Sequence, residues 1–537
     1  KLNVRRFAKT LFFLSILLSL VFISCENPGK KNQKETKERK DELILAIGGE
    51  LETGFDPTIG WGQTARPIFQ STLLKYDKDF NIENDAATDY QISDDGLKWT
   101  VKLRDDIQFS DGKPLTADDV VFTFQTAKNS ASVVDLTNLK GVRKIDSHTI
   151  QFILIKRNYT FIHHLLTMGI VPKHAYTASY GVKPIGSGPY QFVQWDKGQQ
   201  LIIKANPYYY GKKPYFKKLI FLFLSEDAAF AAAKSGQVDV ASVSPSLADK
   251  EIEGMKLVNL KSVDNRGISL PFLPNEGKMI KDRVLGNNVT SDIAIRKAMN
   301  IGVNRKALVS SLLKGYGTPA YSIADGLPWW NPETEIKSDG DVQKAKEILE
   351  NAGWKVGEDG IRKKNNIVAE FTLYYPTDDQ LRQSLAIAFA DMMKALGIKI
   401  DIKGANWNEI ERQFHSNAVL FGLGSHNPLE LYNSFSSNVQ GRGLNNANFY
   451  GNDTVDANFE KALSALSQEE ANGYWKKAQW DGATGFSNKG DASWVWLVNI
   501  NHLFFVRDNL NLGSQKIQPH DHDWPIMDFI ENWHWEK

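Results

Sequence analysis

Residues 368–405 read VAEFTLYYPTDDQLRQSLAIAFADMMKALGIKIDIKGA, and this stretch decides the fold class. We interpret residues 368–377 and 398–405 as strands, and the amphipathic residues 380–397 between them as a helix. A strand, a helix and a second strand in this order predict two parallel strands joined by a right-handed crossover. We therefore expect an α/β protein.

Elements of the same kinds extend in both directions from this unit. On the amino-terminal side, helices are indicated by apolar residues at three and four spacing in SDIAIRKAMNIGVNRKALVSSLLKG from residue 291 and in DVQKAKEILENAGW at 341–354. Further back, a helix is predicted after Thr116. Short apolar or alternating runs predict strands at 43–48, 98–105, 148–154, 189–195 and 200–206.

Length and composition exclude several classes of protein. A chain of 537 residues exceeds the size at which one core stops growing, about 250 to 300 residues, so two or more lobes are expected. The 64 Lys and Arg residues balance 63 Asp and Glu residues, and a net charge of +1 gives no reason to expect nucleic-acid binding. The 14 Trp and 17 Tyr residues suit a protein that stacks against a ligand.

The amino-terminal region reads as an export and anchoring signal. Arg5, Arg6 and Lys9 precede the apolar run LFFLSILLSLVFISC, which ends at Cys25, the only cysteine of the sequence. The run is shorter than the roughly twenty residues that span a bilayer and is typical of a secretory signal. Its end resembles a bacterial lipoprotein lipobox, which implies that Cys25 is lipidated. The alternative is an uncleaved anchor. Residues 26–42 are charged and lack large apolar side chains, so we expect a disordered tether.

No catalytic constellation is recognisable. The sequence has no GxSxG, HExxH, P-loop or CxxC motif, so we do not expect an enzyme, and we expect no cofactor. The adjacent His163 and His164 lie in an apolar, helix-like stretch and are interpreted as structural. His520 and His522 have the HxH spacing that places two imidazoles on one face of an extended chain, so they are weak metal-ligand candidates.

A series of linked motifs points to a family. The motifs, in chain order, are WTVKLRDDIQFSDGKPLTADDVVFTF (99–124), PIGSGPYQF (184–192), NPYYYGKKPYFKKLIFLFL (206–224), AAAKSGQVDV (231–240), DIAIRKAMNIGVNRKALV (292–309), DVQKAKEILENAGW (341–354) and NANFYGNDTVDANFEKAL (446–463). Together they resemble the family 5 extracellular solute-binding proteins, the peptide- and nickel-binding group of ABC importers. The resemblance covers about residues 43–515.

This resemblance implies the large, type II periplasmic-binding-protein fold, with two lobes and an inserted subdomain in the first. We expect chain crossings between the lobes near 280–292 and 495–505. The expected division is 1–25 for the signal and lipidated cysteine, 26–42 for the tether, 43–77, 186–285 and 500–537 for lobe 1, 78–185 for the inserted subdomain, and 286–499 for lobe 2.

The resemblance also implies a ligand enclosed when the lobes close. Peptide-binding members hold the peptide as an extended strand, and many use an aspartate of the second lobe to bind its terminal ammonium group. In this sequence, Asn427 stands at the matching place. Because an amide carries no charge, it forfeits the stronger charge-assisted bond, unless Glu430 replaces it.

Candidate ligand contacts come from loops rich in Gly and Pro and from the segment around Asn427. His426 could face the cleft, and it is also a weak metal candidate. The full set of candidates is Trp61, Arg66, Trp329, Trp330, His426, Asn427, Glu430, Tyr432 and Trp496.

The function expected from these observations is a lipid-anchored receptor, monomeric and exported to the cell envelope. It captures an oligopeptide, or a related zwitterionic or chelate ligand, and delivers it to the permease of an ABC importer. The alternative within the class is a receptor for nickel or a metallophore. The alternatives from other classes are a secreted enzyme and an adhesive lipoprotein without a cleft.

Overall fold

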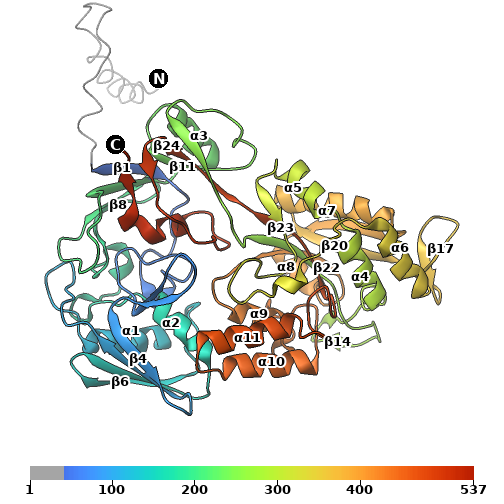
Figure 1. The fold of residues 1–537 in the computed structure, drawn as a ribbon, viewed down its shortest axis with the longest axis horizontal. Helices are drawn as coiled ribbons and strands as arrows, with labels where there is room; N and C mark the ends of the chain where they lie inside the picture. The colour runs from blue at the N-terminus through green and yellow to red at the C-terminus, as the bar shows by residue number, and fades with distance from the viewer. Residues whose placement is uncertain (1–40) are drawn as a thin grey trace, which may run out of the picture. The chain divides into compact units, whose positions relative to one another are not determined.

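The computed structural model describes residues 41–537, which form one compact unit (Figure 1). Cys25, the signal and residues 26–40 of the expected tether lie outside the described residues. Strand β1 begins at Glu42, where Glu42 pairs with Lys218, so the end of the expected tether already belongs to the fold. No helix within residues 41–537 has the length and apolar character needed to cross a membrane.

The first lobe is built on a seven-stranded mixed sheet. Its central strand β1 runs parallel to its two neighbours, and Leu43 and Leu45 of β1 are fully buried. Helix α3 (Glu226–Lys234) packs beside β11. The strand order is β12 (Met255–Leu260), β24 (His502–Arg507), β11 (Val240–Val243), β1 (Glu42–Ala46), β10 (Lys218–Leu222), β9 (Gln200–Ala205) and β8 (Tyr190–Asp196).

The second lobe is built on a six-stranded sheet that contains the predicted crossover unit. Strand β20 pairs in parallel with β21, and α7 (Gln380–Lys394) joins them, so this prediction is confirmed. The carboxylate of Asp379 caps α7 by accepting a hydrogen bond from the Arg382 backbone amide. The strand order is β16 (Gly317–Pro319), β23 (Trp494–Ile500), β13 (Asn265–Ser269), β22 (Ala418–Leu423), β20 (Glu370–Pro376) and β21 (Lys399–Ala405).

Alternation along the strands gives this second sheet two buried faces. Leu420 and Leu497 pack with the helices of one face, whereas Phe421 and Trp496 pack on the other. The first face is covered by α4 (Ile293–Gly302), α5 (Arg305–Leu312), α6 (Val342–Asn351) and α7, and the second carries α8 (Trp407–Gln413), α9 (Leu429–Phe435), α10 (Asp453–Leu463) and α11 (Gln468–Gln479) (Figure 1). Short strands β14 (Met279–Ile280), β15 (Arg283–Val284), β17 (Lys355–Val356), β18 (Arg362–Lys364) and β19 (Ile367–Val368) form small surface sheets.

The inserted subdomain is an antiparallel sheet with two helices. Helix α1 (Ala117–Asn129) begins after Thr116 as predicted, and the Thr116 backbone amide donates to the Asp119 carboxylate at 2.9 Å. A hairpin of β2 (Leu74–Tyr76) and β3 (Ile82–Asn84) leads into the sheet. The sheet order is β4 (Ala87–Ile92), β5 (Lys98–Leu103), β7 (Thr149–Leu154) and β6 (Leu139–Asp146), and α2 (Ile162–Thr167) follows.

Within residues 41–537 the chain passes between the two large sheets at two places. The first passage is residues 261–264, between β12 and β13, and the second is Asn501, between β23 and β24. The predicted lobe boundary at 285 is therefore wrong, because β13 already pairs with β22 and β23 of the second sheet. The helical pattern used to place that boundary begins only after this short strand.

The carboxyl-terminal region returns to the first lobe and also touches both lobes. Residues 516–520, which we call the strap, run beside the first passage, where the Gln518 backbone bonds Lys261 and Val263. After the strap come the 3-10 helix η7 (Trp524–Asn532) and β26 (His534–Trp535), which pairs with β25 (Leu510–Asn511).

The inserted subdomain contacts the second lobe directly. The Phe80 ring lies 6.2 Å from the Trp329 ring and 4.8 Å from the His426 ring, measured between centroids. The Gln468 side-chain amide donates to the Phe80 carbonyl oxygen at 3.1 Å. One apolar cluster runs continuously from the subdomain into the second lobe. The inserted subdomain and the second lobe are therefore packed against each other in this structure.

The burial of α7 predicts a matched pair of substitutions. Phe389 of α7 is fully buried, whereas Ile387 of the same helix is 53% exposed. We expect Phe389→Ala to lower the free energy of unfolding by about 3–5 kcal/mol, because it leaves a cavity between α7 and the sheet. Ile387→Ala is expected to change it by about 0.5 kcal/mol or less. Urea unfolding followed by tryptophan fluorescence measures both, and equal effects of the two substitutions would contradict this packing.

Candidate ligand-binding cavities

A cavity of about 1100 Å³ lies between the first lobe, the inserted subdomain and one loop of the second lobe. The first lobe supplies residues 62–66, 209–212 and 511–534, and the subdomain supplies residues 72–85 and 163–167. The second lobe supplies the loop Gly424–Asn427, which directly follows strand β22. We call this space the large cavity.

Two ion pairs lie within the wall of the large cavity. Arg66 contacts the Glu531 carboxylate at 2.6 Å, and the Tyr209 hydroxyl donates to the same carboxylate at 3.0 Å. Burial alone would raise the pKa of Glu531, but the Arg66 charge outweighs burial and lowers it. Lys516 contacts Asp528 at 2.8 Å. Because these pairs are formed within the wall, a ligand need not supply a particular charge to each of them.

Four histidines line the large cavity, namely the exposed His534 and the less exposed His163, His164 and His426. Burial lowers the pKa of His163 and of His426 to about 3, and that of His164 to about 4, so all three imidazoles are neutral near neutral pH. His426 Nε2 lies 2.8 Å from the Ile517 carbonyl oxygen of the strap. Although we interpreted His163 and His164 as structural from their apolar surroundings, the fold places them at a cavity wall.

A second cavity of about 420 Å³ lies within the second lobe, and we call it the small cavity. It shares Ser425 and Asn427 with the large cavity, so this loop is a wall common to both. Its other lining residues include Arg382, Trp407, Phe421, Glu430, Asn433, Leu444 and Trp494.

The small cavity contains polar groups that the protein leaves without full partners. Trp494 Nε1 is buried and has no hydrogen-bond partner among residues 41–537. Arg382 Nε lies 3.1 Å from Asp379 but not in hydrogen-bonding geometry. Burial, with the nearby Arg266 charge, lowers the pKa of Arg382 to about 10, so Arg382 remains a cation. The Arg382 guanidinium therefore suits a ligand group that accepts hydrogen bonds.

Glu430 supplies an acidic group to the same cavity. Its Oε1 accepts a hydrogen bond from the Gly424 backbone amide at 3.1 Å. Burial raises the pKa of Glu430 to about 8, so the carboxyl group is mostly protonated at neutral pH. A cationic ligand group would favour ionisation of Glu430. The small cavity therefore combines a guanidinium and a titratable carboxyl, as a zwitterionic ligand requires.

The shape of the common wall depends on Gly424. Its φ of +139° is open to glycine and strained for other residues. A side-chain carbon at this position would lie 2.1 Å from the Val263 carbonyl oxygen of the first passage. The end of β22 can thus approach the passage between the lobes only without a side chain at this residue.

The structure places four of the predicted ligand contacts at cavity walls. Arg66 and His426 line the large cavity, Glu430 lines the small one, and Asn427 lines both. The Asn427 side-chain oxygen accepts from the Leu429 amide and so caps α9. Their contact with a ligand remains a prediction.

The other five predicted contacts line neither cavity. Trp61 packs on Phe55 and Trp524 in the first lobe, and Trp329 is 1% exposed beneath Phe80. These loop tryptophans close hydrophobic clusters because the loops fold back over the core. The remaining three have internal partners, with Trp330 bonded to Thr334, Tyr432 packed on Phe459 and Trp496 stacked on Trp494.

The HxH pair near the carboxyl terminus lines neither cavity. His520 Nδ1 lies 2.8 Å from the Asp264 carboxylate, whereas His522 Nε2 accepts from the Leu503 amide at 3.1 Å. The two imidazoles thus have separate protein partners. In residues 41–537, no group of three or more His, Cys, Asp or Glu side chains is arranged to hold a metal ion.

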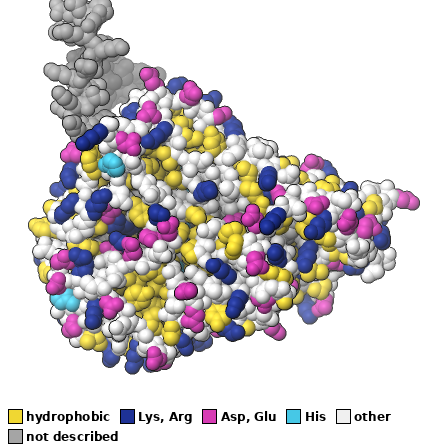
Figure 2. All heavy atoms as spheres, viewed as in Figure 1, with side chains coloured by type: hydrophobic (Ala, Val, Ile, Leu, Met, Phe, Trp, Pro, Cys, Tyr) yellow, Lys and Arg dark blue, Asp and Glu magenta, His cyan; other side chains and the backbone are white. Residues whose placement is uncertain are grey.

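The face shown in Figure 2 carries basic and acidic side chains interspersed over both lobes. This agrees with the net charge of +1. On that face there is no continuous basic surface of the kind that binds nucleic-acid phosphates.

Comparison with known proteins places these features in context. The profile of the bacterial extracellular solute-binding proteins, family 5 middle region, matches residues 81–443. Protein XP55 of Streptomyces lividans is 31% identical over 502 residues, covering 90% of this chain and 88% of XP55. The oligopeptide-binding protein AppA of Bacillus subtilis is 27% identical, covering 87% of this chain and 90% of AppA. The crystal structure of NikZ from Campylobacter jejuni in complex with Ni(L-His) is 25% identical, with a TM-score of 0.71 over 92% of this chain and 99% of NikZ.

The raised pKa of Glu430 predicts a pH dependence of stability. In the unfolded chain this carboxyl ionises near pH 4.5, whereas in the folded protein it holds its proton to about pH 8. Stability therefore falls between these pH values, by up to about 1.4 kcal/mol per pH unit from this group. We expect Glu430→Gln to remove that fall, as measured by urea unfolding at pH 5, 7 and 8.5.

The exposed Glu460 of α10 offers a matched control. Glu460→Gln is expected to keep the pH profile of the unsubstituted protein. A Glu430→Gln profile parallel to that of the unsubstituted protein would show that Glu430 is ionised in the folded state.

Proposed function

The chain belongs to family 5 of the bacterial extracellular solute-binding proteins, and on that premise we propose that it captures oligopeptides for an ABC importer. The observation that carries this proposal is the large cavity, which the lobes and the inserted subdomain enclose together. Its volume of about 1100 Å³ exceeds the range of about 300–1000 Å³ usual for small-molecule sites. An extended ligand of several residues suits this space.

The wall of the large cavity favours tolerance of varied side chains. Its lining holds six Lys or Arg and five Asp or Glu side chains, and Arg66 pairs with Glu531 and Lys516 with Asp528. The cavity therefore places no strong net charge requirement on the residues of a peptide. AppA of Bacillus subtilis, named as an oligopeptide-binding protein, shares sequence similarity with this chain over most of its length.

The small cavity is suited to the charged ends of the same ligand. Arg382 offers a donor for a carboxylate, and Glu430 offers an acceptor for an ammonium group. Because the two cavities share Ser425 and Asn427, a ligand end in the small cavity lies next to the large one. The resulting proposal is a peptide with a free terminus, for which Glu430 replaces the charge that Asn427 lacks.

Delivery requires the protein to stay near a permease. We propose that Cys25, outside the described residues, carries a lipid that holds the otherwise exported chain at the cell envelope, as a monomer. The mass of the amino-terminal peptide from the membrane fraction would reveal the added lipid. A peptide with an unmodified Cys25 would count against anchoring.

The first experiment identifies the ligand. Native mass spectrometry of material that co-purifies with the protein, followed by isothermal titration with those peptides, tests the oligopeptide proposal. We expect Arg382→Gln to weaken binding about ten- to a hundredfold, because it removes a charge-assisted hydrogen bond worth about 1.5–3 kcal/mol.

The exposed Arg412 of α8 provides the matched control, and Arg412→Gln is expected to bind normally. Peptides with an amidated carboxyl terminus should lose affinity for the unsubstituted protein but little more for Arg382→Gln. An equal loss of affinity in both proteins would show that Arg382 does not bind the ligand carboxylate.

A nickel chelate is the second candidate ligand, and a specific observation favours it. His163 and His426 are neutral, line the same cavity and are chemically able to bind a metal. NikZ, whose structure holds Ni(L-His), shares this fold.

Titrations with Ni²⁺ alone, L-histidine alone and both together test this alternative. If the chelate is the ligand, only the mixture binds, and His426→Ala weakens binding at least tenfold, while the control His148→Ala, outside both cavities, leaves binding unchanged. Absence of heat from the mixture would remove nickel chelates from consideration.

A further inference from the structure

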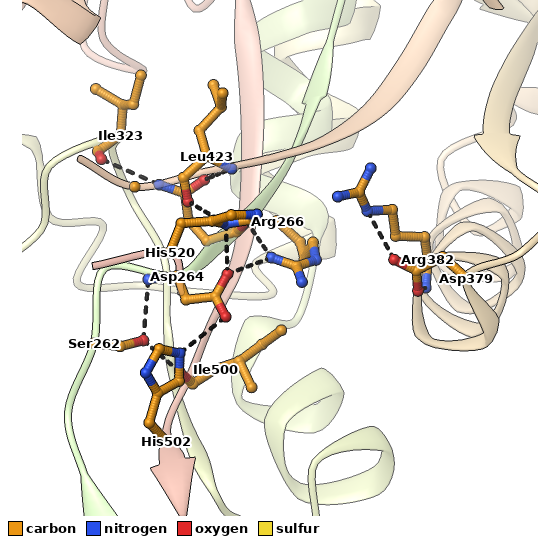
Figure 3. A network of polar contacts seen from close by, with 12 residues as sticks. Ser262, Asp264, Arg266, Ile323, Asp379, Arg382, Leu423, Ile500, His502 and His520 are labelled. Atoms are coloured by element: carbon orange, nitrogen blue, oxygen red, sulfur yellow. Dashed lines mark hydrogen bonds and ion pairs between the residues drawn. The ribbon is translucent and has the colours of Figure 1, made fainter. Parts of the chain in front are cut away.

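A cluster of charged and titratable side chains lies where the lobes join (Figure 3). We call it the junction cluster, and its members are Asp264, Arg266, His502 and His520. Asp264 ends the first passage and His502 directly follows the second. His520 ends the strap. The first passage, the strand that follows the second passage and the strap thus each contribute a residue to the junction cluster.

Asp264 is the centre of the junction cluster and is only 5% exposed. Its Oδ1 lies 2.6 Å from Arg266 Nη1 and 2.8 Å from His520 Nδ1, and its Oδ2 lies 3.0 Å from His502 Nε2. Burial would raise the pKa of Asp264, but these partners outweigh burial and hold it far below its usual range. The carboxylate is therefore permanently charged and needs its partners.

His520 is the member able to exchange protons with solvent, because its side chain is 39% exposed while that of His502 is buried. Burial lowers the pKa of His520, but the Asp264 carboxylate outweighs burial and raises it above its ordinary value. Arg266 opposes this shift, and Asp521 on the same segment supports it.

Two further titratable groups border the cluster. His522 stacks on His502 with centroids 4.6 Å apart, and burial lowers the pKa of His522 to about 3, so it stays neutral. Glu430 of α9 interacts with the His520 charge across the small-cavity wall. His520 is thus linked electrostatically to a group that lines a ligand cavity.

The strap also bonds to the second lobe at the cavity wall. The His520 amide donates to the Gly424 carbonyl oxygen at 2.8 Å, and His520 Nδ1 lies 3.2 Å from the Leu423 carbonyl oxygen. These residues lead into the loop that separates the two cavities. The strap, held against Leu423 and Gly424, therefore supports the wall that the two cavities share.

We propose that protonated His520 is a latch that holds the lobes closed by joining the strap to Asp264 and to the end of β22. The proposal deepens the proposed function and rests on its closing cleft. Loss of the His520 proton replaces an ion pair by a neutral contact and so favours opening. Ligand retention is then strongest in mildly acidic solution and weaker in alkaline solution.

The direction of the pH effect follows from the linkage between proton binding and closing. In the proposed latch, the closed form alone holds His520 against Asp264, which raises the pKa of His520, so protons favour the closed form. The stabilisation is complete below the pKa of the open form and is lost as pH rises through the higher pKa of the closed form. Each unit between the two values changes the closing equilibrium about tenfold.

Hydrogen exchange provides a direct test on the full chain. The peptide covering residues 516–522 contains the His520 amide, whose bond to Gly424 exists in the closed form. We expect its protection factor, corrected for intrinsic exchange, to fall about tenfold between pH 6 and 8.5. The amides of β10 in the first sheet are expected to keep constant protection.

Two variants separate charge from structure. His520→Asn keeps an N–H donor near the Nδ1 position without the charge, and we expect low protection that no longer depends on pH. His148→Asn, in the turn between β6 and β7 far along the chain, is the control and should follow the unsubstituted protein.

A pH profile of His520→Asn identical to that of the unsubstituted protein would overturn the latch. If the variant fails to fold, histidine-selective NMR of the unsubstituted protein decides, since a His520 pKa at or below 6.5 is incompatible with the proposal. Protection that responds to bound peptide but not to pH would reject the latch and retain the closing cleft. Protection that responds to neither would reject both.

Discussion

The arrangement of this protein depends on one buried carboxylate, that of Asp264. An unpaired charge in such a place would be very unfavourable, so Arg266, His502 and His520 must all approach it. These partners come from β13, β24 and the strap, which are far apart in sequence. Compensating a single charge therefore fixes how both lobes meet.

The constraint extends from Asp264 to the cavities through the end of β22. His520 binds Asp264 by its side chain and Gly424 by its backbone, and Gly424 in turn donates to Glu430 in the small cavity. The large cavity shares the loop that follows. The position of the ligand walls and the closure of the lobes are thus parts of one hydrogen-bonded arrangement, which explains why Gly424 tolerates no side chain.

Sequence patterns predicted the secondary structure correctly where residues of the same segment determine it. The β20–α7–β21 crossover and the start of α1 after Thr116 follow from periodicity and capping. The lobe boundary at 285 failed because β13 is a five-residue strand whose Gly267 and Asn265 carry no periodic signal. Only its contacts with neighbouring strands identify β13. The absence of a side chain at Gly267 lets the Trp496 ring lie against the β13 backbone.

The same distinction applies to the candidate site residues. Sequence reasoning located Asn427, His426 and Glu430, because they follow a predicted strand end in a segment that the family resemblance marks. It also selected Trp61 and Trp329, whose loops fold over the core, and it missed Arg382, Trp407 and His163. A helix residue gives no local sign that its outward face will line a cavity.

The sequence by itself determined the class, the order of elements and the family, because periodicity, capping and linked motifs are properties of short segments. Only the tertiary structure decided the two cavities, the pairing of their charges and the junction at Asp264. These depend on contacts between residues as distant as Asp264 and His520. Burial at such contacts sets both the electrostatic cost of a charge and the room left for a ligand.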